Sequence, residues 1–168
     1  PESAGSGRYE ICDSQPRQQA RQLDRLGHGM KKVFVKVHGK PEPKGSVNPM
    51  GSRVTHPEKT KAWETEVRTC VIEQAPGERI GGPVKVTLFF RLTRPPSVPI
   101  RKRRYPTYPP DLDKLSRTVL DAIQDKKGEP IPGLIEDDAR VVALDAVKHY
   151  TDGDREPGVT IVVEGLDL

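Results

Sequence analysis

The segment VKVTLFFRL at residues 84–92 constrains the fold most, because apolar side chains recur at every second position along it. Five of them fall on one face, namely Val84, Val86, Leu88, Phe90 and Leu92. Alternation of this kind indicates a β-strand with one buried face. The segment KKVFVKVH at residues 31–38 alternates in the same way and is predicted to be an earlier strand. Residues 140–148 and 158–164 are predicted to be the last two strands.

Residues 55–71 carry the signals of a helix. Thr55 and Glu58 fit a capping box, in which the two side chains satisfy backbone N–H groups at a helix start. The apolar residues that follow recur at i, i+4, i+7 and i+8, as on one helical face. They are Trp63, Val67, Cys70 and Val71. The tryptophan is therefore expected to lie in the core.

A second helix is predicted to begin at Asp111 and to end at Gly128, with Lys126 and Lys127 near its C-terminus. Its apolar face consists of Leu115, Val119, Ala122 and Ile123. The predicted order of elements is β-α-β-α-β-β. This order indicates a single α+β domain with one mixed four-stranded sheet and two main helices. The 168 residues fit one domain, assigned to residues 30–168, and residues 1–29 are predicted to be a flexible N-terminal tail or extension.

Several classes of protein are excluded by what the sequence lacks. It holds no run of 18 apolar residues and no apolar signal region near its start, so neither a membrane span nor secretion is indicated. Its two cysteines, Cys12 and Cys70, do not form a CxxC motif. The GxSxG, HExxH and GxxxxGK[ST] motifs are absent, so covalent catalysis and a nucleotide cofactor are not indicated.

The positive charge of the chain is concentrated in one segment. The net charge is only +4, which is weak evidence for an anionic partner. Residues 94–110, however, hold six prolines and five cations. The candidate DNA-binding residues there are Arg101, Lys102, Arg103 and Arg104, followed by Tyr105 and Tyr108. A loop of this composition can bind a phosphodiester backbone, although a solvated loop has the same composition.

Two acidic groups stand at the ends of predicted elements. Asp111 and Asp113 open the second helix, and residues 136–138 (EDD) precede the third strand. Carboxylates that converge on one cleft can bind Mg²⁺ and leave water positions open for a phosphate. The alternative is structural: a helix cap, an ion-pair ladder of Asp113, Arg117 and Asp121, and a polar turn.

The loop GKPEPKGS at residues 39–46 is a weaker candidate for contact with phosphate. Lys40 and Lys44 provide its charge, and backbone N–H groups provide donors. The alternative interpretation is a plain turn after a strand.

In combination, these motifs resemble one family. DLDKLSRTVLDAI at residues 111–123, followed by EDDARV at 136–141, is similar to the RusA-type crossover junction endodeoxyribonucleases, or Holliday junction resolvases. The family pattern is a basic loop, then D-L-D-N-L-x-K, D-A-L and D-D-x-Q-V. The resemblance covers about residues 31–164. The G-x-P-x-P-K-G-S loop and the tryptophan-bearing helix resemble members from phages or prophages.

The resemblance implies a metal-dependent nuclease of the bacterial cytoplasm. It implies Mg²⁺, with Mn²⁺ as a substitute, and a homodimer that resolves four-way or branched DNA junctions by paired symmetric nicks. Catalytic roles transfer to Asp111, Asp113 and Asp138, and Arg117 stands where the family has a lysine. The implied metal ligands are these three aspartates together with Asp137.

Three departures from the family pattern bear on activity. Lys114 replaces an asparagine, Arg117 the lysine and Arg140 a glutamine. Lys114 is a further candidate DNA-binding residue. An arginine still neutralises a phosphate but does not donate a proton as a lysine does. The alternatives are therefore a branched-DNA-binding protein with little or no catalysis, and a plain interaction domain.

Overall fold

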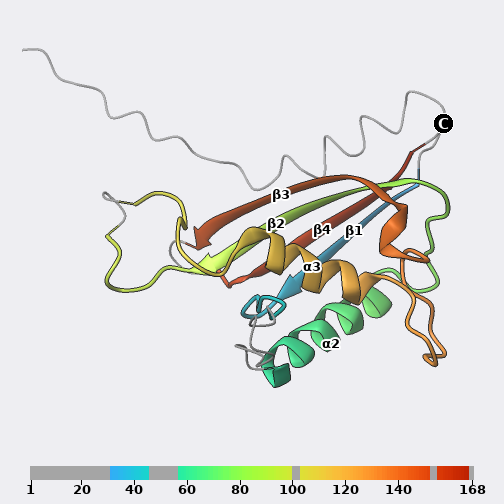
Figure 1. Cartoon of the computed structure of the whole chain (residues 1–168), viewed down its shortest axis with the longest axis horizontal. Helices are drawn as coiled ribbons and strands as arrows, with labels where there is room; N and C mark the ends of the chain where they lie inside the picture. The colour runs from blue at the N-terminus through green and yellow to red at the C-terminus, as the bar shows by residue number, and fades with distance from the viewer. Residues whose placement is uncertain (1–30, 46–56, 100–102, 152–154, 167–168) are drawn as a thin grey trace, which may run out of the picture.

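The computed structural model describes residues 31–45, 57–99, 103–151 and 155–166. The expected N-terminal tail, residues 1–29, lies outside them. The described residues form one four-stranded sheet with two helices against one of its faces (Figure 1). The predicted α+β class and the order β-α-β-α-β-β are both confirmed.

The sheet is mixed, as expected. Its strands are β1 (Lys32–His38), β2 (Val84–Thr93), β3 (Val141–Thr151) and β4 (Gly158–Gly165). They lie in the order β1-β4-β2-β3. Strands β2 and β3 are parallel, and β4 is antiparallel to both β1 and β2. The apolar faces predicted for β1 and β2 are buried against the helices.

The helices are α2 (Pro57–Gln74) and α3 (Leu112–Ile123). The four residues predicted for the inner face of α3 are fully buried, and Trp63 on α2 lies in the same core. Cys70 is only partly buried beside them. Thr55, the expected cap of α2, lies outside the described residues.

The predicted C-terminus of α3 was wrong. The helix ends at Ile123 rather than at Gly128, because Gln124 adopts an extended backbone and forms a parallel bridge with Ile135. The chain then turns back along the end of α3. A short 3-10 helix, η1 (Asp138–Arg140), follows and leads into β3. Residues 136–138 (EDD), here called the acidic turn, are thereby attached to the C-terminal end of α3.

Arg68 on α2 stabilises the end of α3 and the loop that follows it. Its buried guanidinium donates to the backbone carbonyls of Ala122 at 3.2 Å, Gln124 at 2.9 Å and Ile131 at 2.7 Å, and it pairs with Glu129. The bonds to Ala122 and Gln124 satisfy carbonyls that the end of α3 leaves without partners, and the bond to Ile131 holds the loop that follows. Across the described residues, neither helix is long and apolar enough to cross a membrane.

Candidate active site

The first carboxylate of the site lies at the N-terminus of α3. Asp111 occupies the N-cap position but makes no side-chain cap bond. Instead its carboxylate pairs with Lys114 at 2.8 Å. The hydrogen bond from Lys114 lowers the pKa of Asp111, and the nearby charge of Lys148 lowers it further. The same pair raises the pKa of Lys114, so both groups are charged at neutral pH.

Lys148 on β3 fixes the chain just before this helix. Its ammonium donates to the carbonyls of Tyr108 at 3.0 Å and Pro110 at 2.8 Å. These two bonds hold the end of the basic loop, residues 94–110, against the sheet and thereby position Asp111. Sequence reasoning missed Lys148, because its partner Pro110 lies 38 residues away in sequence. Only the parallel pairing of β2 and β3 brings the two residues together.

The ion-pair ladder of Asp113, Arg117 and Asp121, which was the structural alternative to a metal site, does not form among the described residues. Asp121 pairs with Lys44, whose backbone N–H also donates to the carbonyl of Lys114 at 3.0 Å. Among the described residues, Asp113 and Arg117 make neither a hydrogen bond nor an ion pair, and both are exposed. A carboxylate and a guanidinium one helical turn apart are therefore available to a ligand.

The acidic turn lies at the other end of α3. The carboxylate of Asp137 accepts a bond from the N–H of Ala139 at 2.8 Å, and Glu136 pairs with Arg140 at 2.8 Å. The backbone N–H of Asp138 donates to Oε1 of Gln124 at 3.0 Å. Within the described part of the chain, the carboxylate of Asp138 has no bonded partner and is exposed.

One chain therefore does not bring the predicted metal ligands together. Asp111 and Gln124 bracket α3, and a helix of that length spans about 20 Å. Among the described residues, no three side chains of the metal-binding types converge. Asp111 and Asp113 supply the carboxylate oxygens that Mg²⁺ prefers. Asp138 lies beside Gln124 at the opposite end of α3 and does not reach them.

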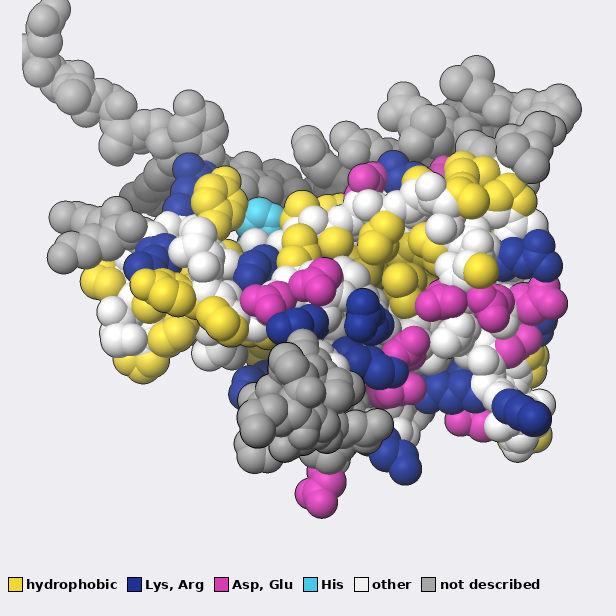
Figure 2. Space-filling view, in the orientation of Figure 1, with side chains coloured by type: hydrophobic (Ala, Val, Ile, Leu, Met, Phe, Trp, Pro, Cys, Tyr) yellow, Lys and Arg dark blue, Asp and Glu magenta, His cyan; other side chains and the backbone are white. Residues whose placement is uncertain are grey.

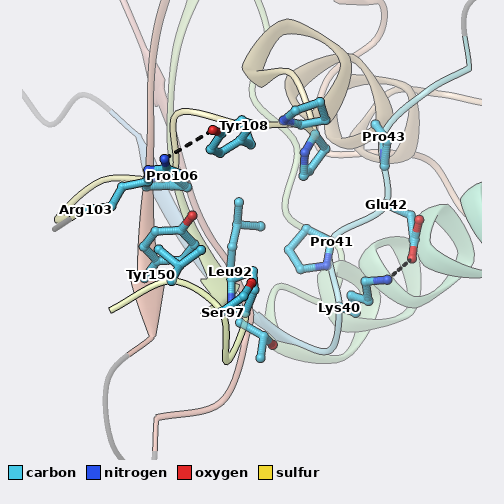
Figure 3. A pocket seen from close by; sticks show the side chains of 15 residues that line it. Lys40, Pro41, Glu42, Pro43, Leu92, Ser97, Arg103, Pro106, Tyr108 and Tyr150 are labelled. Atoms are coloured by element: carbon cyan, nitrogen blue, oxygen red, sulfur yellow. Dashed lines mark hydrogen bonds and ion pairs between the residues drawn. The ribbon is translucent and has the colours of Figure 1, made fainter. Parts of the chain in front are cut away.

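An open cleft of about 850 Å³ lies between the 39–45 loop and the basic loop (Figure 3). Lys40 and Arg103 line it from opposite sides, with Tyr108 and Tyr150 between several prolines. Arg103 stacks on the ring of Tyr108 at 4.1 Å and donates to its hydroxyl at 3.2 Å. The cleft continues to Pro110, next to Asp111.

The predicted DNA-binding residues fall into three groups. Arg103 and Arg104 lie on the described part of the basic loop, whereas Arg101 and Lys102 lie outside the described residues. Lys40 pairs with Glu42 at 3.3 Å at the cleft. Lys44 is paired with Asp121 of α3, and Lys114 is paired with the N-cap residue Asp111. Figure 2 accordingly shows basic and acidic side chains next to one another on the face that carries α3.

The basic loop therefore leads into exposed carboxylates and an arginine that makes no bond among the described residues, an arrangement that can accept a phosphodiester. Residues 38–164 match the family model described as Endodeoxyribonuclease RusA, and the chain belongs to this family. The family comprises nucleases that bind branched DNA and resolve Holliday junctions. No curated protein matches the chain.

Proposed function

We propose that this chain cuts four-way DNA junctions by paired symmetric nicks, as a Mg²⁺-dependent homodimer in the bacterial cytoplasm, with Mn²⁺ as a substitute metal. The observation that carries the proposal is the accessibility of two side chains, those of Asp113 and Arg117. Both side chains are exposed on α3 without a bonded partner among the described residues. Their exposure leaves a carboxylate and a guanidinium on one face of α3 accessible to a phosphate and a metal ion.

In this proposal, different residues bind the DNA backbone, stabilise charge on the phosphate and ligate the metal ion. The basic loop binds the DNA backbone and is fixed to β3 by Lys148. Arg117 lies one turn into α3, where its guanidinium can bind the scissile phosphate and stabilise charge that develops on it. Asp111 and Asp113 are the oxygen donors of this end of the helix. A bound Mg²⁺ would supply an activated water and would neutralise phosphate charge.

The variant Asp113→Asn tests this proposal. It removes one negative charge but keeps the shape of the side chain, so junction binding should persist while nicking is abolished. Glu73→Gln is the matched control, because Glu73 is an exposed acid on α2, away from the basic loop. If the Asp113→Asn variant still nicks a labelled four-way junction at the natural rate, the catalytic role of Asp113 is contradicted.

A binding protein without catalysis is the second candidate function. The separation of Asp138 from Asp111 and Asp113 in one protomer favours it. This function predicts salt-sensitive binding of branched DNA that Mg²⁺ does not change and that yields no product. The same labelled junction distinguishes the two functions, because a shifted but uncut band supports binding alone.

A further inference from the structure

The open cleft of about 850 Å³ beside the N-terminal end of α3 has a mostly apolar lining. Leu92 of β2 and Tyr150 of β3, which are register partners in the sheet, form part of it. Six other lining residues are prolines, namely Pro41, Pro43, Pro95, Pro106, Pro109 and Pro110. A proline provides an apolar ring and no backbone N–H. The lining therefore suits a flat ligand that is recognised mainly by its faces.

Both walls of this cleft are held by bonds to other elements. On one side, the hydroxyl of Thr60 on α2 donates to the carbonyl of Pro43 at 3.0 Å. On the other side, Lys148 on β3 holds the carbonyls of Tyr108 and Pro110. The cleft is therefore formed before a ligand arrives, and a preformed site binds without the entropy cost of ordering its walls.

A stacked pair of planar groups lines the cleft (Figure 3). The guanidinium of Arg103 lies 4.1 Å from the centre of the Tyr108 ring and donates to its hydroxyl. Although the arginine covers part of the ring, Tyr108 is still 57% exposed. Aromatic rings and arginine planes are the surfaces on which proteins stack unpaired nucleobases. The pair can therefore accept a base as the next layer of the stack.

The charge and the position of the cleft fit the phosphate that such a base carries. Lys40 and Glu42 pair at 3.3 Å, so their charges offset one another and Arg103 provides the positive charge of the lining. The cleft extends to Pro110, the residue before Asp111. A nucleotide in the cleft can therefore be joined directly to a phosphate at the N-terminal end of α3.

We propose that the cleft binds one unpaired nucleotide of the DNA strand, next to the scissile phosphate, with its base stacked on the Tyr108–Arg103 pair. The position next to a scissile phosphate rests on the proposed nuclease function, whereas the binding of an unpaired nucleotide does not. Taking a base out of a duplex costs stacking and pairing, and this cost is least where the base is already unpaired. The cleft thereby selects DNA with an unpaired nucleotide at a branch point. Stacking accepts any of the four bases, because each has a π-face.

The variant Tyr108→Leu tests the stacking in EDTA, where no cleavage is required. Leucine is apolar but has no ring, and because Tyr108 is exposed the chain should still fold. Affinity for a junction with unpaired nucleotides at its branch point should fall about 5-fold to 100-fold, as for the loss of one stacked base. Affinity for a linear duplex should not change. Tyr108→Phe keeps the ring and should retain the affinity. The matched control is Phe34→Leu, because Phe34 is similarly exposed, at 55%, but lies on β1 outside the cleft.

An abasic scan identifies the nucleotide that enters the cleft. In a series of these junctions, each nucleotide beside the branch point is replaced in turn by an abasic residue, which keeps the sugar and phosphate. The natural chain should lose affinity at one position, by about the factor seen for Tyr108→Leu. In Tyr108→Leu that position should no longer matter, because the same contact cannot be lost twice.

The outcomes separate this inference from the proposed function. An unchanged affinity of Tyr108→Leu, or equal abasic sensitivity of the two proteins at every position, would overturn the nucleotide site even if the natural chain cuts junctions. A natural chain that shows the abasic effect in EDTA but cuts no junction in Mg²⁺ would overturn the proposed function instead, and the nucleotide site would stand.

Discussion

The backbone N–H of Asp138 donates to Oε1 of Gln124 at 3.0 Å, and this bond joins the acidic turn before β3 to the first residue after α3. Gln124 is itself fixed, because its carbonyl accepts from Arg68 and its backbone bridges to Ile135. The position of Asp138 therefore depends on α2 and α3 as well as on its own turn.

Gln124→Met should lower the nicking rate and leave junction binding unchanged. Methionine keeps the length of the side chain but has no amide oxygen, so Asp138 loses its fixed position. A small displacement of a reacting group can slow a reaction about a hundredfold. The expected loss of folding stability is about 1 kcal/mol, measured by urea denaturation. The control is Gln74→Met, which also removes an amide that bonds backbone but lies at β1. Equal nicking rates for the two variants would refute a positioning role for Gln124.

Arg117→Ala should lower nicking without affecting the fold. Arg117 makes no bond to the described residues, so the free energy of unfolding should change by less than about 0.5 kcal/mol. Removal of one group that stabilises transition-state charge typically slows a reaction about 10²-fold to 10³-fold. Arg117→Lys keeps the charge and should retain measurable nicking. The nicking rate and the melting curve are compared for all three proteins, and a large loss of stability in Arg117→Ala would reveal a structural role instead.

Lys114→Met should raise the pKa of Asp111 towards its ordinary value. In the natural chain the bond from Lys114 lowers this pKa, so the ionised carboxylate favours the folded state at pH values above the ordinary carboxyl pKa. That contribution is lost as the pH falls through the lowered pKa. The variant should lose most of this contribution, and its remaining titration should move to higher pH. Carbon-13 NMR titration measures the pKa of the Asp111 carboxyl in the natural chain and in Lys114→Met. Identical pKa values in the two proteins would contradict the pairing of Asp111 with Lys114.

Arg103→Ala should weaken junction binding and reduce its salt dependence. Each phosphate contact releases counterions, so loss of one contact should lower the slope of log affinity against log salt by about 0.9. Lys36→Ala is the control, because Lys36 lies on β1 with its side chain exposed, away from the basic loop. Affinities measured across a salt series provide both slopes. An unchanged slope for Arg103→Ala would show that Arg103 does not contact the DNA backbone.

Strands β1 and β2 and the inner faces of the helices could be predicted because each buries a single face of regular period. The end of α3 could not be predicted, because Gln124 forms a backbone bridge with Ile135, eleven positions further along the chain, and leaves the helix there. Local signals such as Lys126, Lys127 and Gly128 fit a helix end but do not report this bridge.

The site was predictable only in part, for the same reason. Asp111 and Asp113 adjoin the basic loop in sequence, so the place where that loop meets α3 could be read directly. The pairing of Lys44 with Asp121 joins residues 77 positions apart, and the role of Lys148 depends on the β2–β3 pairing. The placement of Asp138 at the opposite end of α3 follows from the direction of that helix between two parallel strands. Residue spacing alone does not report such contacts.

The other predictions depend on the claim that this chain cleaves branched DNA with the help of a metal ion. The most direct measurement incubates the natural chain with a labelled synthetic four-way junction, in Mg²⁺ and in EDTA, beside a linear duplex of the same sequence. Paired symmetric nicks in the junction, present with Mg²⁺ and absent with EDTA or in the duplex, are the predicted result. A junction that is bound but stays uncut in Mg²⁺ would contradict the claim.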